Sequence, residues 1–242
     1  MIGEGRYVPP EARDIKQFKP EELTTEDDFT EFWLAFRRNN PFVLQTPERE
    51  RRTAAMQAKA ELRNMQEQNK PTHIFGVKDN GQLIAAGKIE IRTKDDEKHG
   101  YLSMLTVDEN YRGKGLAKQL TDVRMEIARD EGCTHIDTDV FTENPIALVT
   151  KLNDGYTLAD LEFYGDDKKA GRFVLSKKID GKPEYDKREG PLGGLQELEL
   201  SDLSAIKNLL EQGWVGIDAK NLGDSKDKDP KQWKLIMEQT TK

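Results

Sequence analysis

The sequence has one cysteine, no long hydrophobic run and no excess of positive charge. A single cysteine, Cys133, cannot form a disulfide within the chain, which favours a reducing compartment and predicts a cytoplasmic protein. No apolar stretch approaches the ~18 residues of a membrane-spanning helix, so we expect no membrane partner. The polar residues after Met1 and Ile2 do not form the apolar core of a signal peptide. Secreted disulfide-stabilised domains and membrane proteins are therefore not expected.

Charge and histidine content argue against two further classes of protein. The formal net charge of −7 disfavours non-specific nucleic-acid binding, which requires a basic surface. The three histidines, His73, His99 and His135, have no metal-ligand spacing, so we expect no metal site. The chain does have 35% hydrophobic and 34% charged residues over 242 positions, enough for one sizeable core.

The most informative stretch is residues 101–132, YLSMLTVDENYRGKGLAKQLTDVRMEIARDEG. A short apolar run that ends at Val107 predicts a strand, and the following RGKG predicts a turn. Apolar residues at three- and four-residue steps then predict an amphipathic helix, which Gly132 closes. A strand, a glycine turn and a helix in this order direct free backbone N–H groups and the positive end of the helix dipole at one place. The stretch therefore predicts an anion site, and a pyrophosphate is the expected anion.

The remaining periodicity predicts a mixed succession of helices and strands. Phe29, Phe32, Trp33 and Phe36 fall on one helical face, which is typical of a core helix. Asp79-Asn80-Gly81 separates two apolar runs and predicts a β-hairpin. The further predicted elements are a helix over 48–69 and, after the glycine turn, a strand over 134–141, a helix over 144–153 and strands over 158–164 and 172–179.

The glycine turn resembles the acetyl-CoA loop of the GNAT family of N-acetyltransferases. It follows the strand end at Val107 and contains R-x-x-G-x-A, filled by Arg112, Gly115 and Ala117. The predicted order β-β-β-α-β-α-β-β over residues 22–180 is also similar to the family's. The resemblance implies an α/β protein with the GNAT fold, in which helices flank a mostly antiparallel mixed sheet with splayed middle strands.

The resemblance also implies acetyl-CoA as the co-substrate and a set of residues that bind it. Main-chain groups of Leu105 and Val107 would contact the pantetheine arm. Asn144 would lie near that arm at the start of the next helix, although a plain helix cap would look the same. The pyrophosphate would lie on the backbone N–H groups of Arg112, Gly113, Lys114, Gly115, Leu116 and Ala117.

The catalytic groups of the family match this sequence less well. Family members often have a tyrosine that acts as the general acid, in the helix before a Gly-Phe or Gly-Tyr pair. That pair is here Gly155-Tyr156. Val149 or Lys151 occupies that place, so no general acid is identifiable. The candidate bases come from neighbouring strands: Glu90, Asp137 and Asp139. For each of them an exposed charge without a role is the favoured interpretation, because charged residues are normally exposed.

The ends of the chain lie outside the family fold. Residues 1–21 are predicted to form an N-terminal arm, the acetyltransferase domain covers 22–180, and residues 181–200 form a linker. Residues 201–242 are predicted to form a C-terminal helical extension, with a helix after Ser201-Asp202 and a final short helix that holds Trp233, Ile236 and Met237. The apolar faces of this extension either fold back on the domain or dock on another subunit, since short helices are marginal alone.

Two functions remain open at this point. The first is an acetyl-CoA-dependent N-acetyltransferase that moves the acetyl group directly to a primary amine of a small molecule or a protein. The acidic residues around the expected acceptor groove suit a cationic acceptor: Glu90, Asp137, Asp139 and Glu162. The second is a GNAT-fold module without catalysis, which serves in an assembly or a homo-oligomer through its terminal extensions.

Overall fold

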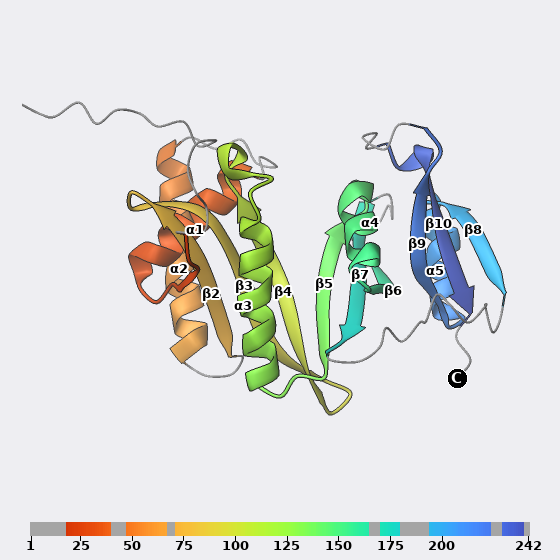
Figure 1. The fold of residues 1–242 in the computed structure, drawn as a ribbon, viewed down its shortest axis with the longest axis horizontal. Helices are drawn as coiled ribbons and strands as arrows, with labels where there is room; N and C mark the ends of the chain where they lie inside the picture. The colour runs from red at the N-terminus through yellow and green to blue at the C-terminus, as the bar shows by residue number, and fades with distance from the viewer. Residues whose placement is uncertain are drawn as a thin grey trace, which may run out of the picture. The chain divides into compact units, whose positions relative to one another are not determined.

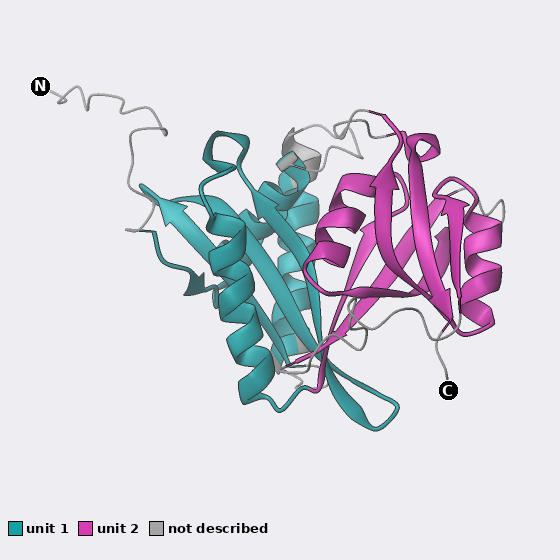
Figure 2. Ribbon diagram, turned by 45° about the vertical axis from the view of Figure 1, so that its right-hand side comes forward, with its two compact units in different colours: residues 1–133 teal, residues 134–242 magenta. Residues whose placement is uncertain are grey.

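The computed structural model describes the chain over residues 18–39, 47–66, 71–164, 170–179, 194–223 and 229–239. It forms two compact units, residues 1–133 and 134–242 (Figure 2). Most of the expected N-terminal arm and of the expected linker lies outside the described residues. Within the described residues, every helix is too short or too polar to cross a membrane.

The first unit contains an antiparallel sheet of four strands in the order β1-β2-β3-β4 (Figure 1). Two tight turns connect the long strands, because Asn80-Gly81 and Asp95-Asp96 all adopt positive φ, as two-residue hairpin turns require. The hairpin predicted around Asn80 is therefore confirmed. The strands are β1 (Glu21–Glu22), β2 (Thr72–Asp79), β3 (Gln82–Lys94) and β4 (Glu97–Val107).

Helices pack two separate hydrophobic clusters against this sheet. Side chains alternate along a strand, so the neighbours Ile74 and Phe75 belong to different clusters. The Ile74 cluster includes Phe29 and Phe32, both fully buried, so these two residues of the aromatic stripe are core, whereas Trp33 and Phe36 are half-buried. The Phe75 cluster includes Leu116 from the helix after the glycine turn. The helices are α1 (Glu26–Asn39), α2 (Pro47–Gln66) and α3 (Leu116–Asp130), with a short 3-10 turn η3 (Glu109–Tyr111) before α3.

The second unit contains six strands in the order β5-β7-β6-β9-β10-β8 and two helices (Figure 1). The pairs within this order are antiparallel. Its elements are β5 (His135–Phe141), α4 (Pro145–Asn153), β6 (Thr157–Tyr164), β7 (Ala170–Lys178), β8 (Leu195–Glu199), α5 (Leu203–Glu211), β9 (Trp214–Asn221), η4 (Pro230–Gln232) and β10 (Trp233–Gln239).

The C-terminal extension is not entirely helical. The helix predicted after Ser201-Asp202 is present as α5, but the expected final helix is wrong, because Trp233, Ile236 and Met237 lie on strand β10 between β8 and β9. Three apolar residues within so short a segment fit the period of a helix as well as that of a strand. The segment forms a strand because it pairs with two neighbouring strands. The extension folds back within the second unit, since β9 pairs with β6 and α5 contacts β6.

Candidate functional site

The glycine turn forms as the sequence predicted, between the end of β4 and the start of α3. The Asp108 carboxylate accepts a hydrogen bond from the Asn110 N–H at 3.0 Å and so caps the 3-10 turn. Gly113 and Gly115 follow with φ of 73° and 85°, in the left-handed region that favours glycine. A β-carbon on Gly113 would meet no atom within 4 Å, so the backbone conformation, and not crowding, requires glycine there.

The N-terminal end of α3 is unusual in having no side-chain cap. Gly115 occupies the N-cap position and its carbonyl accepts from the Gln119 N–H at 3.1 Å, but no side chain of the described residues bonds to the first amides. The first N–H groups of a helix have no partner within the helix. The Arg112 N–H is less available, because it donates to the Glu109 carbonyl at 3.4 Å. The turn therefore presents the amides from Gly113 onward, together with the positive end of the helix dipole.

A buried lysine ammonium in this turn has no hydrogen-bond partner in the part of the chain that the structure describes. The Nζ atom of Lys114 is inaccessible to solvent and has no hydrogen-bond acceptor among the residues that the structure describes. It lies 5.5 Å from the centre of the Tyr111 ring, which the aromatic ring of Phe18 contacts edge-on. The Tyr111 hydroxyl itself donates to Asp79. An anion bound at the turn would supply the partner that this ammonium lacks, so the residues present fit a pyrophosphate.

Strand β4 has a β-bulge at the place where the cofactor arm is expected. Met104 and Leu105 face the single residue Gly87 of β3. Met104 has a φ of 54°, which is rare for a residue with a side chain, and packs on the cluster formed with α1 and α2. The Leu105 side chain is 37% exposed and Val107 is half-buried. A bulge interrupts the ladder and leaves some main-chain groups of the strands without their usual partners.

Arg124 of α3 fills the space that the bulge and Gly87 leave open. A β-carbon on Gly87 would lie 2.9 Å from the Arg124 guanidinium carbon. The guanidinium is almost completely buried, and its Nη1 donates to the carbonyls of Lys88 and Ser103 at 3.2 and 3.4 Å. Its Nε donates to the Leu120 carbonyl one turn earlier at 3.0 Å. Arg124 therefore ties α3 to both strands beside the bulge.

The sequence analysis did not single out Arg124. The available signal was its position, because Arg124 lies four residues after Leu120 and four before Ala128, both of which are fully buried. A charged residue on the buried face of an amphipathic helix indicates a specific polar partner in the core.

Glu90 lies in a partly buried group of charged residues on β3. Lys88 Nζ approaches Glu90 at 3.7 Å, and Arg92 Nε donates to the Glu90 carboxylate at 2.8 Å. The same Lys88 ammonium lies 2.6 Å from the carboxylate of Glu61 on α2, which is 7% exposed. The Arg92 guanidinium carbon lies 3.6 Å from the centre of the Tyr101 ring. The sequence analysis missed Glu61, whose long-range partner gives no local signal.

Asp137 and Asp139 lie on β5 in the second unit, and both are half-buried. The Ser176 hydroxyl donates to Asp137 at 2.6 Å. Asp139 lies 3.6 Å from Arg172 Nη1, while Arg172 also pairs with Glu162 at 2.6 Å. Both carboxylates are thus held by neighbouring polar side chains of the same sheet.

Asn144 begins α4 as a helix cap. Its side-chain oxygen accepts from the Ala147 N–H at 3.2 Å, and the residue is exposed. In the same region Tyr156 is buried, with Lys151 Nζ 5.2 Å from its ring centre. A role of Asn144 in cofactor binding stays a prediction.

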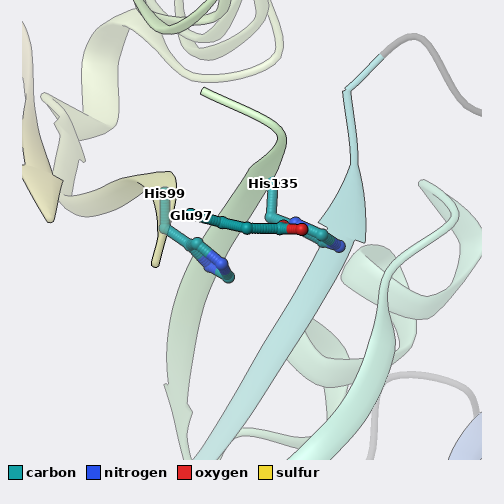
Figure 3. A group of neighbouring side chains, drawn as sticks. All are labelled: Glu97, His99 and His135. Atoms are coloured by element: carbon teal, nitrogen blue, oxygen red, sulfur yellow. The ribbon is translucent and has the colours of Figure 1, made fainter. Parts of the chain in front are cut away.

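The cysteine and the histidines add no catalytic group that we can assign. Cys133 is buried, and this burial raises the pKa of its thiol, which disfavours the nucleophilic thiolate. All three histidines lie on strands, with His73 on β2. His99 lies on β4 two residues after Glu97, and His135 begins β5 in the second unit; Figure 3 labels these three side chains.

Known proteins share both the sequence pattern and the fold of this chain. The model of the acetyltransferase (GNAT) family matches residues 29–149, half of the chain. N-alpha-acetyltransferase 30 of Saccharomyces cerevisiae is 39% identical over 49 residues, which are 20% of this chain; the chain thus spans only 28% of that relative's length. A GNAT-family protein of Desulfovibrio desulfuricans has the same fold, with a TM-score of 0.52, 12% identity and coverage of 66% of this chain and 98% of its own. Ribosomal-protein-alanine N-acetyltransferase from Brucella melitensis is likewise similar in fold, with a TM-score of 0.50, 14% identity and coverage of 66% and 99%.

Proposed function

The chain belongs to the GNAT acetyltransferase family, and from this premise we propose that it transfers an acetyl group from acetyl-CoA to a primary amine. One observation carries the proposal: an uncapped helix start, entered through two left-handed glycines, beside an ammonium that has no hydrogen-bond partner among the described residues. These features suit a pyrophosphate and have no evident structural purpose, since an N-cap side chain stabilises a helix by about 1 kcal/mol.

The residues that would hold acetyl-CoA are those of the turn and of β4. The N–H groups of Gly113, Lys114, Gly115, Leu116 and Ala117 would bind the pyrophosphate. Arg112 would contribute the charge of its exposed guanidinium, whose Nε also donates to the Val107 carbonyl at 3.2 Å. The main chain of Leu105 and Val107 would contact the pantetheine arm. When bound, acetyl-CoA supplies the thioester that the amine attacks.

Arg124 acts in this proposal as a positioning residue. Its two hydrogen bonds to the carbonyls of Lys88 and Ser103 hold the strands on either side of the bulge. The main chain of Leu105 is thereby kept in one place relative to α3. Fixed placement of the reactants accounts for much of the rate of a transfer reaction.

The candidate base in the same unit as the turn is Glu90. The acceptor amine must lose a proton when its nitrogen forms the new C–N bond and the C–S bond breaks, and a carboxylate can take this proton. Lys88 pairs with both Glu61 and Glu90, and Arg92 also pairs with Glu90, so the two carboxylates are balanced by two cations. Asp137 and Asp139 stay predictions as alternative bases.

The acceptor that we propose to test first is the α-amino group of a protein. The yeast relative is named as an N-alpha-acetyltransferase, and the Brucella structure as a ribosomal-protein-alanine N-acetyltransferase. Lysine side chains and polyamines are the comparison acceptors, because each also presents a primary amine with positive charge.

Calorimetric titration with acetyl-CoA tests the proposal. We expect wild-type protein to bind, and Gly115→Glu to lose most of the affinity. The matched control is Gly132→Glu at the other end of α3, where glycine also has a positive φ of 72° and open space. Absence of binding by the wild type at millimolar acetyl-CoA would contradict the proposal and favour a GNAT-fold module without catalysis. Thiol release with the panel of amines then separates an enzyme from a protein that only binds the cofactor.

A further inference from the structure

The second unit consists of two segments with the same succession of elements. The first copy, residues 135–178, runs β5-α4-β6-β7, and the second copy, residues 195–239, runs β8-α5-β9-β10 (Figure 1). Helices α4 and α5 both have 9 residues. The sheet begins with the strands of the first copy in the order β5-β7-β6. The equivalent strands of the second copy follow in the reverse order, β9-β10-β8. The copies therefore have the same elements in a symmetric arrangement.

The two helices begin and end in the same way. Asn144 caps α4 by accepting from the Ala147 N–H at 3.2 Å, and Asp202 caps α5 by accepting from the Ala205 N–H at 3.0 Å. Gly155 and Gly213 end the helices, both with a φ of 84°. They are separated along the chain by the same number of residues as the caps Asn144 and Asp202, and this separation is the offset between the copies. A buried aromatic residue follows each glycine and begins the next segment: Tyr156 and Trp214.

The strands that follow the helices share an irregularity at the same offset. The register of β6 shifts between Leu158 and Asp160, and the register of β9 shifts between Gly216 and Asp218. After each bulge the aspartate carboxylate accepts a hydrogen bond from the next N–H, at 2.7 Å for Asp160 and 2.8 Å for Asp218. A bulge is a specific feature of a strand, so its repetition with the same aspartate is evidence for duplication.

The pairing of the outer strands also repeats. Phe141 faces Arg172 in the first copy, and the equivalent Glu199 faces Lys234 in the second. One residue further, the Thr142 N–H donates to the Gly171 carbonyl at 3.1 Å, and the Leu200 N–H donates to the Trp233 carbonyl at 2.9 Å. The copies therefore agree in register as well as in element order.

The copies contact each other through equivalent positions. Leu158 of β6 pairs with Gly216 of β9, and these two residues correspond under the same offset. The helix of each copy contacts the strand of the other, α4 with β9 and α5 with β6. Contacts in which each surface meets its own equivalent are the mark of a two-fold symmetric dimer.

We propose that residues 195–239 are an internal duplicate of residues 135–178 and act as a two-fold partner within the same chain. The duplicate pairs with β6 at Leu158, on an edge that would otherwise be open to strand pairing with another molecule. The two copies differ at the point of closest approach, where a β-carbon on Gly216 would lie 2.9 Å from the Leu158 β-carbon. Leucine therefore fits against glycine there, whereas the first copies of two chains would bring leucine against leucine. The chain's own second copy occupies this edge, so the protein does not dimerise through this surface.

Light scattering of the full chain tests the proposal together with one pair of variants. We expect the wild type to have the mass of one chain, 27.6 kDa. Gly216→Leu makes the two copies alike at their contact, and we expect a lower unfolding temperature and self-association that rises with concentration. The control Gly223→Leu adds the same side chain where the nearest atom is 3.8 Å away, and should behave as the wild type. A wild-type dimer, or a Gly216→Leu protein with unchanged mass and unfolding temperature, would overturn the proposal.

A half-exposed ion pair offers a milder test if Gly216→Leu does not fold. Lys207 Nζ on α5 of the second copy lies 2.7 Å from the carboxylate of Asp160 on β6 of the first. Asp160→Lys places two ammonium groups together, so we expect association at lower protein concentration than for the wild type. Exchanging the charges in Asp160→Lys with Lys207→Asp should restore the monomer. A double variant that associates as readily as the single one would show that this contact does not hold the copies together.

Discussion

Two helices of the first unit begin in opposite ways. At the start of α1, the Thr25 hydroxyl accepts from the Asp28 N–H at 3.1 Å, while the Asp28 carboxylate accepts from the Thr25 N–H at 3.3 Å and from its hydroxyl at 2.7 Å. This reciprocal capping satisfies the amides that a helix start leaves open. At the start of α3, Gly115 offers no side chain at all.

The difference separates a helix start built for stability from one built for a ligand. A capping carboxylate near the first turn stabilises the helix dipole, but it repels any anion that approaches. An uncapped start gives up about 1 kcal/mol of stability and keeps its N–H groups for an anionic ligand.

The largest effect is expected at the buried face of α3, where Arg124 takes the place that Phe29 and Phe32 have on α1. Arg124→Met leaves the carbonyls of Lys88 and Ser103 buried without their donor, so we expect a loss of about 3 kcal/mol in the free energy of unfolding. The KM for acetyl-CoA should rise more than kcat falls, because the Leu105 main chain is displaced. Urea denaturation and steady-state kinetics measure the two effects.

Two further variants separate positioning by Arg124 from general stability. Arg129→Met removes an exposed arginine from the same helix and should change neither quantity appreciably. Arg124→Lys can reach one carbonyl but not both, and should give an intermediate KM. An Arg124→Met protein that loses stability but keeps the wild-type KM would show that Arg124 has no positioning role.

The carboxylate at the start of α1 predicts a pH-dependent stability. Burial of Asp28 acts to raise its pKa, but hydrogen bonds from Lys78 and Thr25 outweigh burial and lower the pKa to about 2. The unfolded value is near 3.8, so this contribution is present above pH 4 and is lost as the pH falls towards 2. Asp28→Asn should lose it at neutral pH and show a flatter stability curve between pH 4 and pH 2. Equal curves for both proteins would mean that this carboxylate is not the group that titrates.

The contrast between α1 and α3 also shows which features could be predicted from the sequence. The glycine turn and the amphipathic face of α3 are local, because glycine spacing and three- to four-residue periodicity depend only on neighbours along the chain. Arg124 and Glu61 depend on partners far away in the sequence, and no local rule assigns a carbonyl of Ser103 to a guanidinium on the next helix. Residue type alone therefore predicts these two charged side chains to be exposed, whereas the fold buries them.

The duplicated segments explain the wrong helix at the C-terminus. The copies keep the same bulges, caps and register, but they have few identical side chains, among them Ala147 and Ala205. The bulges and the register become visible only when the strands are paired. The one signal in the sequence is the equal spacing from cap to glycine, Asn144 to Gly155 and Asp202 to Gly213, which aligns the two copies.

The turn before α3 should lose cofactor affinity when it is given a negative charge. Gly115→Glu places a carboxylate at the positive end of the helix dipole and at the expected pyrophosphate site, so we expect the Kd for acetyl-CoA to rise roughly tenfold or more. Titration calorimetry measures this change, and Gly132→Glu controls for the loss of a left-handed glycine. Equal losses in the two variants would trace the effect to the backbone and not to the charge at the helix start.

The smallest effects should distinguish the equivalent caps of α4 and α5. Asn144→Ala and Asp202→Ala each remove one capping hydrogen bond, so we expect both to lower the free energy of unfolding by about 1 kcal/mol. Only Asn144→Ala should raise the KM for acetyl-CoA, because the family resemblance places Asn144, and not Asp202, near the pantetheine arm. Denaturation and kinetics on both variants give the comparison. An unchanged KM in Asn144→Ala would leave Asn144 a structural cap, the role that Asp202 has in the second copy.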